Sequence, residues 1–320
     1  MKKIRIKKRS LILFMAGIVI SMTIFDGLRR ELFRPSNADS ITKKGSFPTV
    51  PSDGRPDDAN IISFKDGIAP ENSFSGVESP GYIKSSFTAD DLATGFLTII
   101  NEQHPGKENS DSSKVVLENF KNEHYSVADE NITLNKDAAE ALNQLMADYN
   151  AATGLSDFIV YGTDNTYTGA GSYCAKDFPE RISGNTVDLA LIGCGSIISY
   201  DGFDEEGWVV QHCAEYGFIV RCPEGKAEFT GQKYCPWHLR YVGKVHSAIM
   251  SENNMCLEEY VAFLKNYSQS EPFQYKLKNT EYNIYTIPYE GDSTVVEVPI
   301  RGNYEKSGDN IDTFIITVRR

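Results

Sequence analysis

Residues 216–243 read YGFIVRCPEGKAEFTGQKYCPWHLRYVG, and this stretch decides the fold. Its apolar runs at 218–221 and 238–242 are each typical of a short strand. Polar residues with glycines separate the two runs, so a loop is expected between them. Just upstream, residues 206–216 have the pattern of a helix, and Gly217 is placed to end it.

Helix and strand patterns continue on both sides of this stretch without regular alternation. Residues 135–149 place apolar side chains at helical spacing, with Asn135 as the expected N-cap and Gly154 as the end. A further helix is expected at 257–265. Further strands are expected at 95–101, 158–161 and 186–192. This mixture predicts an α+β fold.

The pattern changes near residue 272. From there to the end no helical period appears, and three β-rich runs occupy 282–288, 293–299 and 313–318. We therefore predict a small C-terminal all-β extension at 272–320. Its length of about 50 residues is small for independent stability, so it should pack on the main domain.

The N-terminus has the pattern of a secretory signal or a membrane anchor. Six basic side chains crowd residues 1–9, and an apolar run follows at 10–25. Because no small-x-small cleavage site follows, we predict an uncleaved transmembrane signal anchor at 10–25, behind a cytoplasmic segment at 1–9. A cleaved signal stays open, and the run is shorter than the ~20 residues of a usual spanning helix. Residues 26–88 are rich in Ser, Pro, Gly, Asp and Lys, and predict an extracellular tether.

Composition and cysteine count limit the class of protein. The chain has 320 residues, of which 41% are hydrophobic and 24% charged, as in ordinary globular proteins. A net charge of -12 argues against nucleic acid as a partner. The six cysteines permit three disulfides outside the membrane, but the sequence does not choose their pairing. They are Cys174, Cys194, Cys213, Cys222, Cys235 and Cys256.

The quoted stretch resembles the extracellular zinc D-alanyl-D-alanine carboxypeptidases of bacteria, the VanY type. That family has YGFI-x-R-x-P, then T-G, then Y-E-P-W-H-x-R-Y-V-G, and this chain matches all but one of these conserved letters at 216–243. The resemblance implies a VanY/D-Ala-D-Ala carboxypeptidase-like α+β domain at 89–267. It also implies a cell-wall setting, with peptidoglycan stem peptide or a cell-wall protein as partner.

The resemblance also implies a catalytic zinc with three protein ligands. Two ligands come from S-x-H-x-x-G-x-A-x-D and the third is the His of P-W-H. By this match His238 is the third ligand and Asp188 the second. The first ligand position falls on Arg181, whose guanidinium has no lone pair for a metal. Zinc is therefore expected to be absent or weakly bound, and we predict that Arg181 pairs with Asp188 in its place.

The catalytic base and the substrate contacts are altered as well. The family's general base, a Glu three residues before the P-W-H histidine, falls on Cys235. The family's carboxylate-binding Arg aligns with Asp164. Tyr234, Trp237 and Arg240 are the other candidates for substrate binding, with core packing as the alternative for the aromatic side chains.

The same residues allow other interpretations. Cys235 with His238 allows a thiol nucleophile, or a metal set completed by Asp188, but a disulfide or a buried thiol is favoured. His212 is expected on a helix surface, with replacement ligand as the alternative. The acidic run 201–206 is expected to be a solvated helix start rather than a calcium site.

Two functions follow from these residues. The favoured one is a membrane-anchored, catalytically impaired pseudoenzyme that binds stem peptide outside a bacterial cell membrane. The alternative is an active zinc D,D-carboxypeptidase whose metal is completed by residues outside the motif. Whether the chain is an enzyme stays open, because one zinc ligand and the general base are replaced.

Overall fold

The computed structural model describes residues 81–320, except 108–112, 163–177, 204, 292 and 301–303. These residues belong to a compact unit, Ser75–Arg320, and a first unit, Met1–Phe74, lies outside the described residues. The predicted anchor at 10–25 is therefore not described. Within the part of the chain that is described, no helix has the length and hydropathy needed to cross a membrane.

A mixed sheet forms the centre of the part that carries the sequence motifs. Its strands run in the order β3-β5-β6-β9-β8, and β7 pairs with β6. The strands are β3 (Ser126–Val127), β5 (Phe158–Gly162), β6 (Thr186–Gly193), β7 (Ser196–Ser199), β8 (Phe218–Cys222) and β9 (Cys235–Tyr241). All pairs are antiparallel except β3 with β5. The predictions for β5, β6 and β8 are confirmed, whereas β9 begins earlier than expected.

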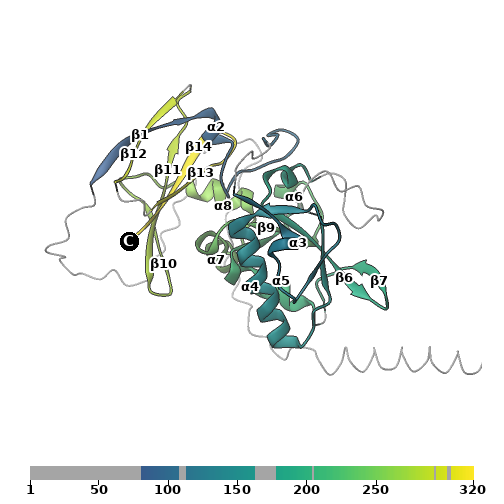
Figure 1. Cartoon of the computed structure of the whole chain (residues 1–320). Helices are drawn as coiled ribbons and strands as arrows, with labels where there is room; N and C mark the ends of the chain where they lie inside the picture. The colour runs from purple at the N-terminus through teal and green to yellow at the C-terminus, as the bar shows by residue number, and fades with distance from the viewer. Residues whose placement is uncertain (1–80, 108–112, 163–177, 204, 292, 301–303) are drawn as a thin grey trace, which may run out of the picture. The chain divides into compact units, whose positions relative to one another are not determined.

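Helix α4 (Lys136–Thr153) packs beside this sheet (Figure 1). The Asn135 side chain accepts a hydrogen bond of 3.0 Å from the backbone N–H of Asp137, and Gly154 ends the helix with φ of 77°. Both predicted ends of this helix are confirmed. The shorter helices are α2 (Ala89–Leu92), α3 (Leu117–Phe120), η1 (Pro179–Ser183), α5 (Gly207–His212), η2 (Cys213–Tyr216), α6 (Ala227–Thr230), α7 (Lys244–Glu252) and α8 (Leu257–Leu264).

The C-terminal region is all β, as predicted. Its sheet has the order β10-β11-β14-β13, and β12 pairs with β1 outside this sheet. The strands are β10 (Phe273–Leu277), β11 (Thr280–Pro288), β12 (Ser293–Pro299), β13 (Tyr304–Gly308) and β14 (Thr313–Arg319). A separate small sheet joins β2 (Lys114–Val116) and β4 (Thr133–Asn135). The sequence predicted β11, β12 and β14, but not β10 or β13.

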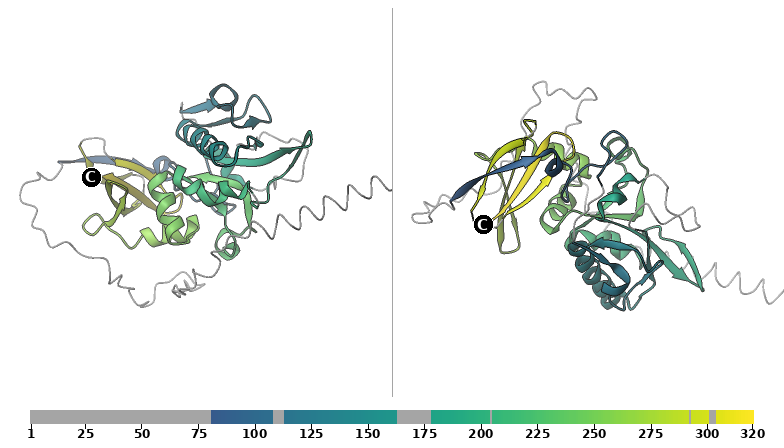
Figure 2. Two further views of the ribbon diagram at one scale, coloured as in Figure 1. Left: turned by 90° about the horizontal axis from the view of Figure 1, so that it is seen from below. Right: turned by 45° about the horizontal axis from the view of Figure 1, so that its top comes forward.

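Two sequence predictions are wrong near the N-terminal end of the described part. Residues of β1 (Tyr82–Thr88) were expected in the tether, yet they pair in register with β12, and Figure 2 shows β1 beside the C-terminal strands. That partner is more than 200 residues away in the chain, so no local pattern reveals it. Residues 95–101 were expected to form a strand, but they form a buried irregular segment. Its backbone donates to Ser307 and Asp309 instead of to a ladder.

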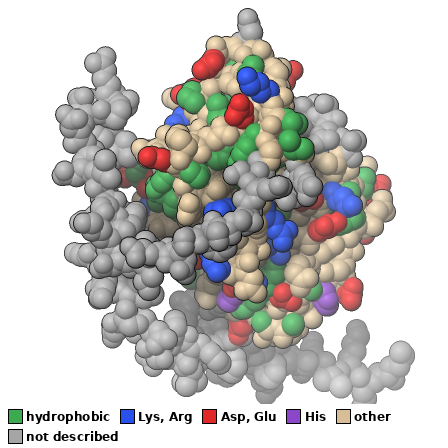
Figure 3. Space-filling view, turned by 90° about the vertical axis from the view of Figure 1, so that its left-hand side faces the viewer, with side chains coloured by type: hydrophobic (Ala, Val, Ile, Leu, Met, Phe, Trp, Pro, Cys, Tyr) green, Lys and Arg blue, Asp and Glu red, His purple; other side chains and the backbone are tan. Residues whose placement is uncertain are grey.

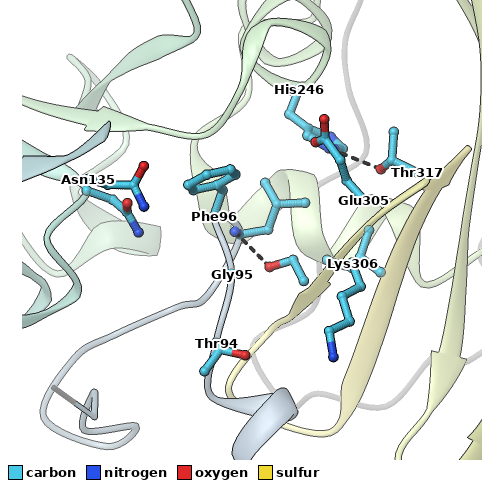
Figure 4. Close-up of a pocket in the computed structure, with 12 residues that line it drawn as sticks. Thr94, Gly95, Phe96, Asn135, His246, Glu305, Lys306 and Thr317 are labelled. Atoms are coloured by element: carbon cyan, nitrogen blue, oxygen red, sulfur yellow. Dashed lines mark hydrogen bonds between the residues drawn. The ribbon is translucent and has the colours of Figure 1, made fainter. Parts of the chain in front are cut away.

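The C-terminal strands share a core with the helices that follow the motif. Ile284 and Ile315 pack with Val242, Ile249 and Tyr260, which confirms the predicted packing of the extension. A pocket of about 360 Å³ lies at this junction. Figure 4 shows the residues that line it. The packing keeps these apolar side chains out of water and so contributes to the stability of both parts.

A buried histidine contacts both a helix and a C-terminal strand at this junction. His246 is 4% exposed, and its Nδ1 is 2.8 Å from the Tyr260 hydroxyl. Its Nε2 is 3.1 Å from Thr317 Oγ1 (Figure 4). Burial lowers the pKa of His246 to about 3. An unfolded chain has a histidine pKa of about 6.5, so between these values only the unfolded state takes up the proton.

We therefore expect the free energy of unfolding to fall as the pH drops below about 6.5. The loss from His246 should approach about 1.4 kcal/mol for each pH unit. Urea unfolding at pH 7 and pH 5 measures it. A His246→Gln variant should lose this contribution, whereas His124→Gln, at a partly exposed histidine, should keep it. An equal pH dependence in wild type and His246→Gln would contradict the assignment.

The surface carries charges of both signs. On the face seen in Figure 3, acidic and basic side chains lie interspersed, and hydrophobic side chains are scattered among them. The described atoms visible there show no broad basic surface. The hairpin of β6 and β7 projects from the main sheet (Figure 1) and carries exposed Ile192, Ile197 and Ile198.

Candidate functional site

Two strands and one short helix bring the motif residues together. In the antiparallel pair of β6 and β9, Asp188 lies directly opposite His238. Helix η1 ends just before β6, and it carries Glu180 and Arg181. Gly184, with φ of 69°, caps η1 in the left-handed region that favours glycine. The local fold therefore places four ionisable side chains around one point in the interior.

His238 has a carboxylate at each ring nitrogen. Its Nδ1 is 2.5 Å from Asp188 Oδ1, and its Nε2 is 2.8 Å from Glu180 Oε1. The ring is fully buried, and burial alone would lower its pKa. The two carboxylates outweigh burial and raise the pKa of His238. With an acceptor at each nitrogen, the ring is best satisfied as an imidazolium that donates twice.

Arg181 lies against the other oxygen of Asp188. Its Nη2 is 2.7 Å from Asp188 Oδ2, and both side chains are buried, so the predicted pair is confirmed. The N–H bonds of the guanidinium do not point at that oxygen, so the contact is an ion pair without an aligned hydrogen bond. The guanidinium also lies 5.6 Å from the centre of the Phe178 ring.

Glu180 is the residue that the sequence analysis missed. Besides His238, its carboxylate is 2.8 Å from Arg221 Nε and 3.3 Å from Arg240 Nη1. Burial alone would raise the pKa of Glu180, but Arg221, His238 and Arg240 outweigh it and hold the pKa well below its usual range. One feature of the sequence could have indicated Glu180. The motif segments contain three arginines, and buried arginines need anionic partners. Glu180 is the acidic residue next to the altered ligand position.

The charges of this cluster nearly balance. Arg221 also reaches Glu258, with Nη2 2.5 Å from Oε1. Three carboxylates thus face three guanidiniums and one imidazolium. We call this set the buried ion cluster, and its members are Glu180, Arg181, Asp188, Arg221, His238, Arg240 and Glu258.

Arg240 does not lie where a substrate contact is needed, so that prediction is corrected. The side chain has no exposed surface, and Nη2 donates to Thr98 Oγ1 at 3.0 Å and to the Phe96 carbonyl at 3.3 Å. Burial lowers the pKa of Arg240 to about 10. Its role in this arrangement is to hold residues 96–98 and Glu180 in place.

The other predicted binding residues differ in exposure. Tyr234 is 37% exposed, and Trp237 is partly buried with its ring edge-to-face on Phe178 at 5.5 Å. Asp164 lies outside the described residues. His212 stacks on Trp208 at 4.1 Å, as a helix histidine rather than a ligand.

The general-base position holds a buried thiol. Cys235 begins β9, is 8% exposed, and lies opposite Cys222 of β8. Its Sγ donates to the Lys233 carbonyl at 3.1 Å, and the mutual influence of the two thiols lowers the pKa of Cys235 and raises that of Cys222. By the motif match, this thiol lies where the family is expected to have the carboxylate that accepts a proton from metal-bound water.

Comparison with known proteins identifies the family. The VanY family, described as D-alanyl-D-alanine carboxypeptidase, matches residues 183–244. A D-alanyl-D-alanine carboxypeptidase of Enterococcus faecium is 32% identical over 247 residues, which cover 73% of this chain and 78% of the relative. The chain belongs to the VanY family of D-alanyl-D-alanine carboxypeptidases.

Two further comparisons agree with this family and its fold. The bifunctional D-Ala-D-Ala dipeptidase and carboxypeptidase VanXYC of Enterococcus gallinarum is 28% identical over 192 residues, covering 52% of this chain and 94% of the relative. The crystal structure of the vancomycin-resistance D,D-dipeptidase VanXYg, in complex with a D-Ala-D-Ala phosphinate analogue, matches with a TM-score of 0.64. It is 24% identical, and the match covers 75% of this chain and 100% of that chain. The predicted VanY-like fold is thereby confirmed.

The residues present do not fit the zinc expected of the VanY family. Both nitrogens of His238 already face carboxylates, and Asp188 shares its free oxygen with the Arg181 cation. The first ligand position therefore offers a positive charge instead of a lone pair. Among the residues that the structure describes, no group of three or more His, Cys, Asp or Glu side chains is arranged to hold a metal.

Proposed function

We propose that this chain is a catalytically impaired member of the VanY family that binds peptidoglycan stem peptides without cleaving them. The observation that carries the proposal is the Arg181 guanidinium, 2.7 Å from Asp188 at the place of a zinc ligand. The positive charge of Arg181 neutralises the buried carboxylate of Asp188. A bound metal ion would do the same in the family.

Electrostatic repulsion favours the arginine over a metal at this position. At about 4 Å and an effective dielectric constant of about 20, two unit charges repel by about 4 kcal/mol, and a dication repels Arg181 roughly twice as strongly. Loss of the general base at Cys235 would by itself remove a factor of ~10²–10⁴ from the rate. The two changes act on the same step, so hydrolysis should be very slow.

The relatives' substrates support the choice of ligand. The named relatives are D-Ala-D-Ala peptidases, and this chain has Tyr234 and Trp237 next to Cys235 and His238 in the sequence. Tyr234, which is partly exposed, offers a ring face and a hydroxyl for a peptide backbone. The Trp237 ring packs edge-to-face on Phe178, and its centre lies 5.6 Å from the centre of the His238 ring.

We also propose that residues 10–25 anchor the chain in a bacterial membrane, with the folded part outside. The basic residues at 1–9 and the uncharged run behind them support this orientation. Expression of the full chain and of a chain lacking residues 2–25, followed by alkaline carbonate washing, tests it. Only the full chain should stay in the membrane pellet, and recovery of both chains in the wash would contradict the anchor.

Binding is tested with an N-acetylated peptide that ends in D-Ala-D-Ala, titrated into the full chain by calorimetry. We expect saturable binding with no free D-Ala released, and no binding of the L-Ala-L-Ala peptide. Tyr234→Ala should weaken binding about tenfold, which corresponds to about 1.4 kcal/mol. Tyr82→Ala is the matched control, because Tyr82 is also exposed but lies on β1. Absence of binding, or steady release of D-Ala, would contradict the proposal.

A further inference from the structure

Two cysteines face each other across neighbouring strands. In the antiparallel pair of β8 and β9, Cys222 is the partner of Cys235. Directly opposed residues in such a pair have Cα atoms about 4.5–5.5 Å apart, and disulfides span about 4.4–6.8 Å. Their side chains project from the same face of the sheet, and both pack against Phe178. The usual separation of paired residues thus lies within the range that a disulfide spans, next to a register shift between Val220 and Cys222.

The surroundings of this pair also favour a bond. Cys222 is 1% exposed and Cys235 is 8% exposed, and both pack against Phe178 with Trp237 at the edge. The other described cysteines lie in a hairpin turn, a 3₁₀ helix and a helix N-cap. They are Cys194, Cys213 and Cys256. Among the strand pairs of the described residues, only β8 with β9 sets two cysteines opposite each other.

We propose that Cys222 and Cys235 are a dithiol that a small-molecule disulfide such as cystine oxidises to a disulfide. Cys235 is the more exposed, so its thiolate attacks cystine, forms a mixed disulfide and expels one cysteine thiolate. The Cys222 thiolate then attacks Sγ of Cys235 and expels the second cysteine thiolate. Two protein thiols are oxidised, cystine is reduced to two cysteines, and the two thiol protons pass to the two leaving thiolates.

The disulfide has a consequence for the VanY-type site. It fixes the residue at the general-base position to the neighbouring strand, and it closes the loop that carries α6 between β8 and β9. The proposal depends on the strand pairing alone, so it stands whether or not the chain binds or cleaves stem peptide.

Peptide mapping of the full chain tests the bond. The protein is treated with cystine, quenched in acid, alkylated in denaturant and digested with trypsin. Cleavage after Arg221, Lys226, Lys233 and Arg240 should give a linked species of peptides 222–226 and 234–240, which disappears on reduction. Alkylation of both thiols in the oxidised protein, or a link from either to a different cysteine, would overturn the proposal.

Thermal unfolding supplies a second readout. A closed loop of this size should raise the melting temperature of the oxidised chain by on the order of 5–10 °C relative to the reduced chain. Cys222→Ala should abolish the rise, whereas Cys256→Ala should keep it, because Cys256 lies at a helix N-cap. A rise that persists in Cys222→Ala would assign the effect to another pair. If Cys222→Ala does not fold, the peptide map of the wild type decides alone.

Discussion

Replacing Glu180 with glutamine is expected to destabilise the folded chain by about 3–5 kcal/mol. The substitution keeps the shape of the side chain but removes the negative charge that faces Arg221, Arg240 and His238. Arg221, Arg240 and His238 would then have only Asp188 and Glu258 as carboxylates in the cluster. Asp188 is also paired with Arg181. A buried pair that loses one partner leaves an uncompensated charge, which costs more than the pair itself contributes. Urea unfolding followed by circular dichroism measures the change.

The matched control is Glu140→Gln on the exposed side of α4. Glu140 lies 3.7 Å from Lys136 one helical turn away, and both side chains are more than half exposed. Such a pair contributes about 0.3–0.5 kcal/mol, so the control should shift stability by no more than that. Equal effects of the two substitutions would mean that Glu180 is not the centre of the buried ion cluster.

Restoring the family's residues should restore the family's metal. In a chain that carries both Arg181→His and Cys235→Glu, the guanidinium is gone. The neutral imidazole introduced at position 181 then joins Asp188 and His238 as the third ligand. Glu180 and Asp188 are then left with less positive charge around them, which favours a dication. We expect about one zinc for each chain, and release of D-Ala at least ~10²-fold faster than in the wild type.

A second variant separates the gain of a ligand from the loss of repulsion. Arg181→Leu with Cys235→Glu removes the same charge but offers no lone pair, so it should bind less zinc and stay slow. Zinc is measured by elemental analysis of the purified chains, and D-Ala by a coupled oxidase assay. If the histidine and leucine variants behave alike, the first ligand position is not what limits zinc binding here.

The fold was largely readable from local patterns. The end signals of α4, Asn135 and Gly154, act through hydrogen bonds within a few residues, so they are visible in the sequence. The strand β1 was not predicted, because its sequence YIKSSFT has no alternation of apolar and polar residues, and its partner β12 lies near the other end of the chain. The segment 95–101 is apolar and buried as expected, but its hydrogen bonds go to the C-terminal strands, and no local rule forecasts that.

The site was predicted in part. Motif spacing placed Asp188 and His238 together, and the charge of Arg181 implied a carboxylate partner, which the structure confirms. Glu180 was missed because its place in the family motif carries no chemistry; only its burial beside His238 gives it a role. Arg240 was assigned to substrate by its position in the motif, but its side chain points into the core.

The central claim is that an arginine has taken the place of the catalytic zinc. The most direct test measures zinc in the full wild-type chain after purification in the presence of excess zinc and removal of free metal. We predict well under one zinc for every ten chains, with no D-Ala released from a D-Ala-D-Ala peptide. About one zinc for each chain, together with D-Ala release that His238→Ala abolishes, would contradict the account.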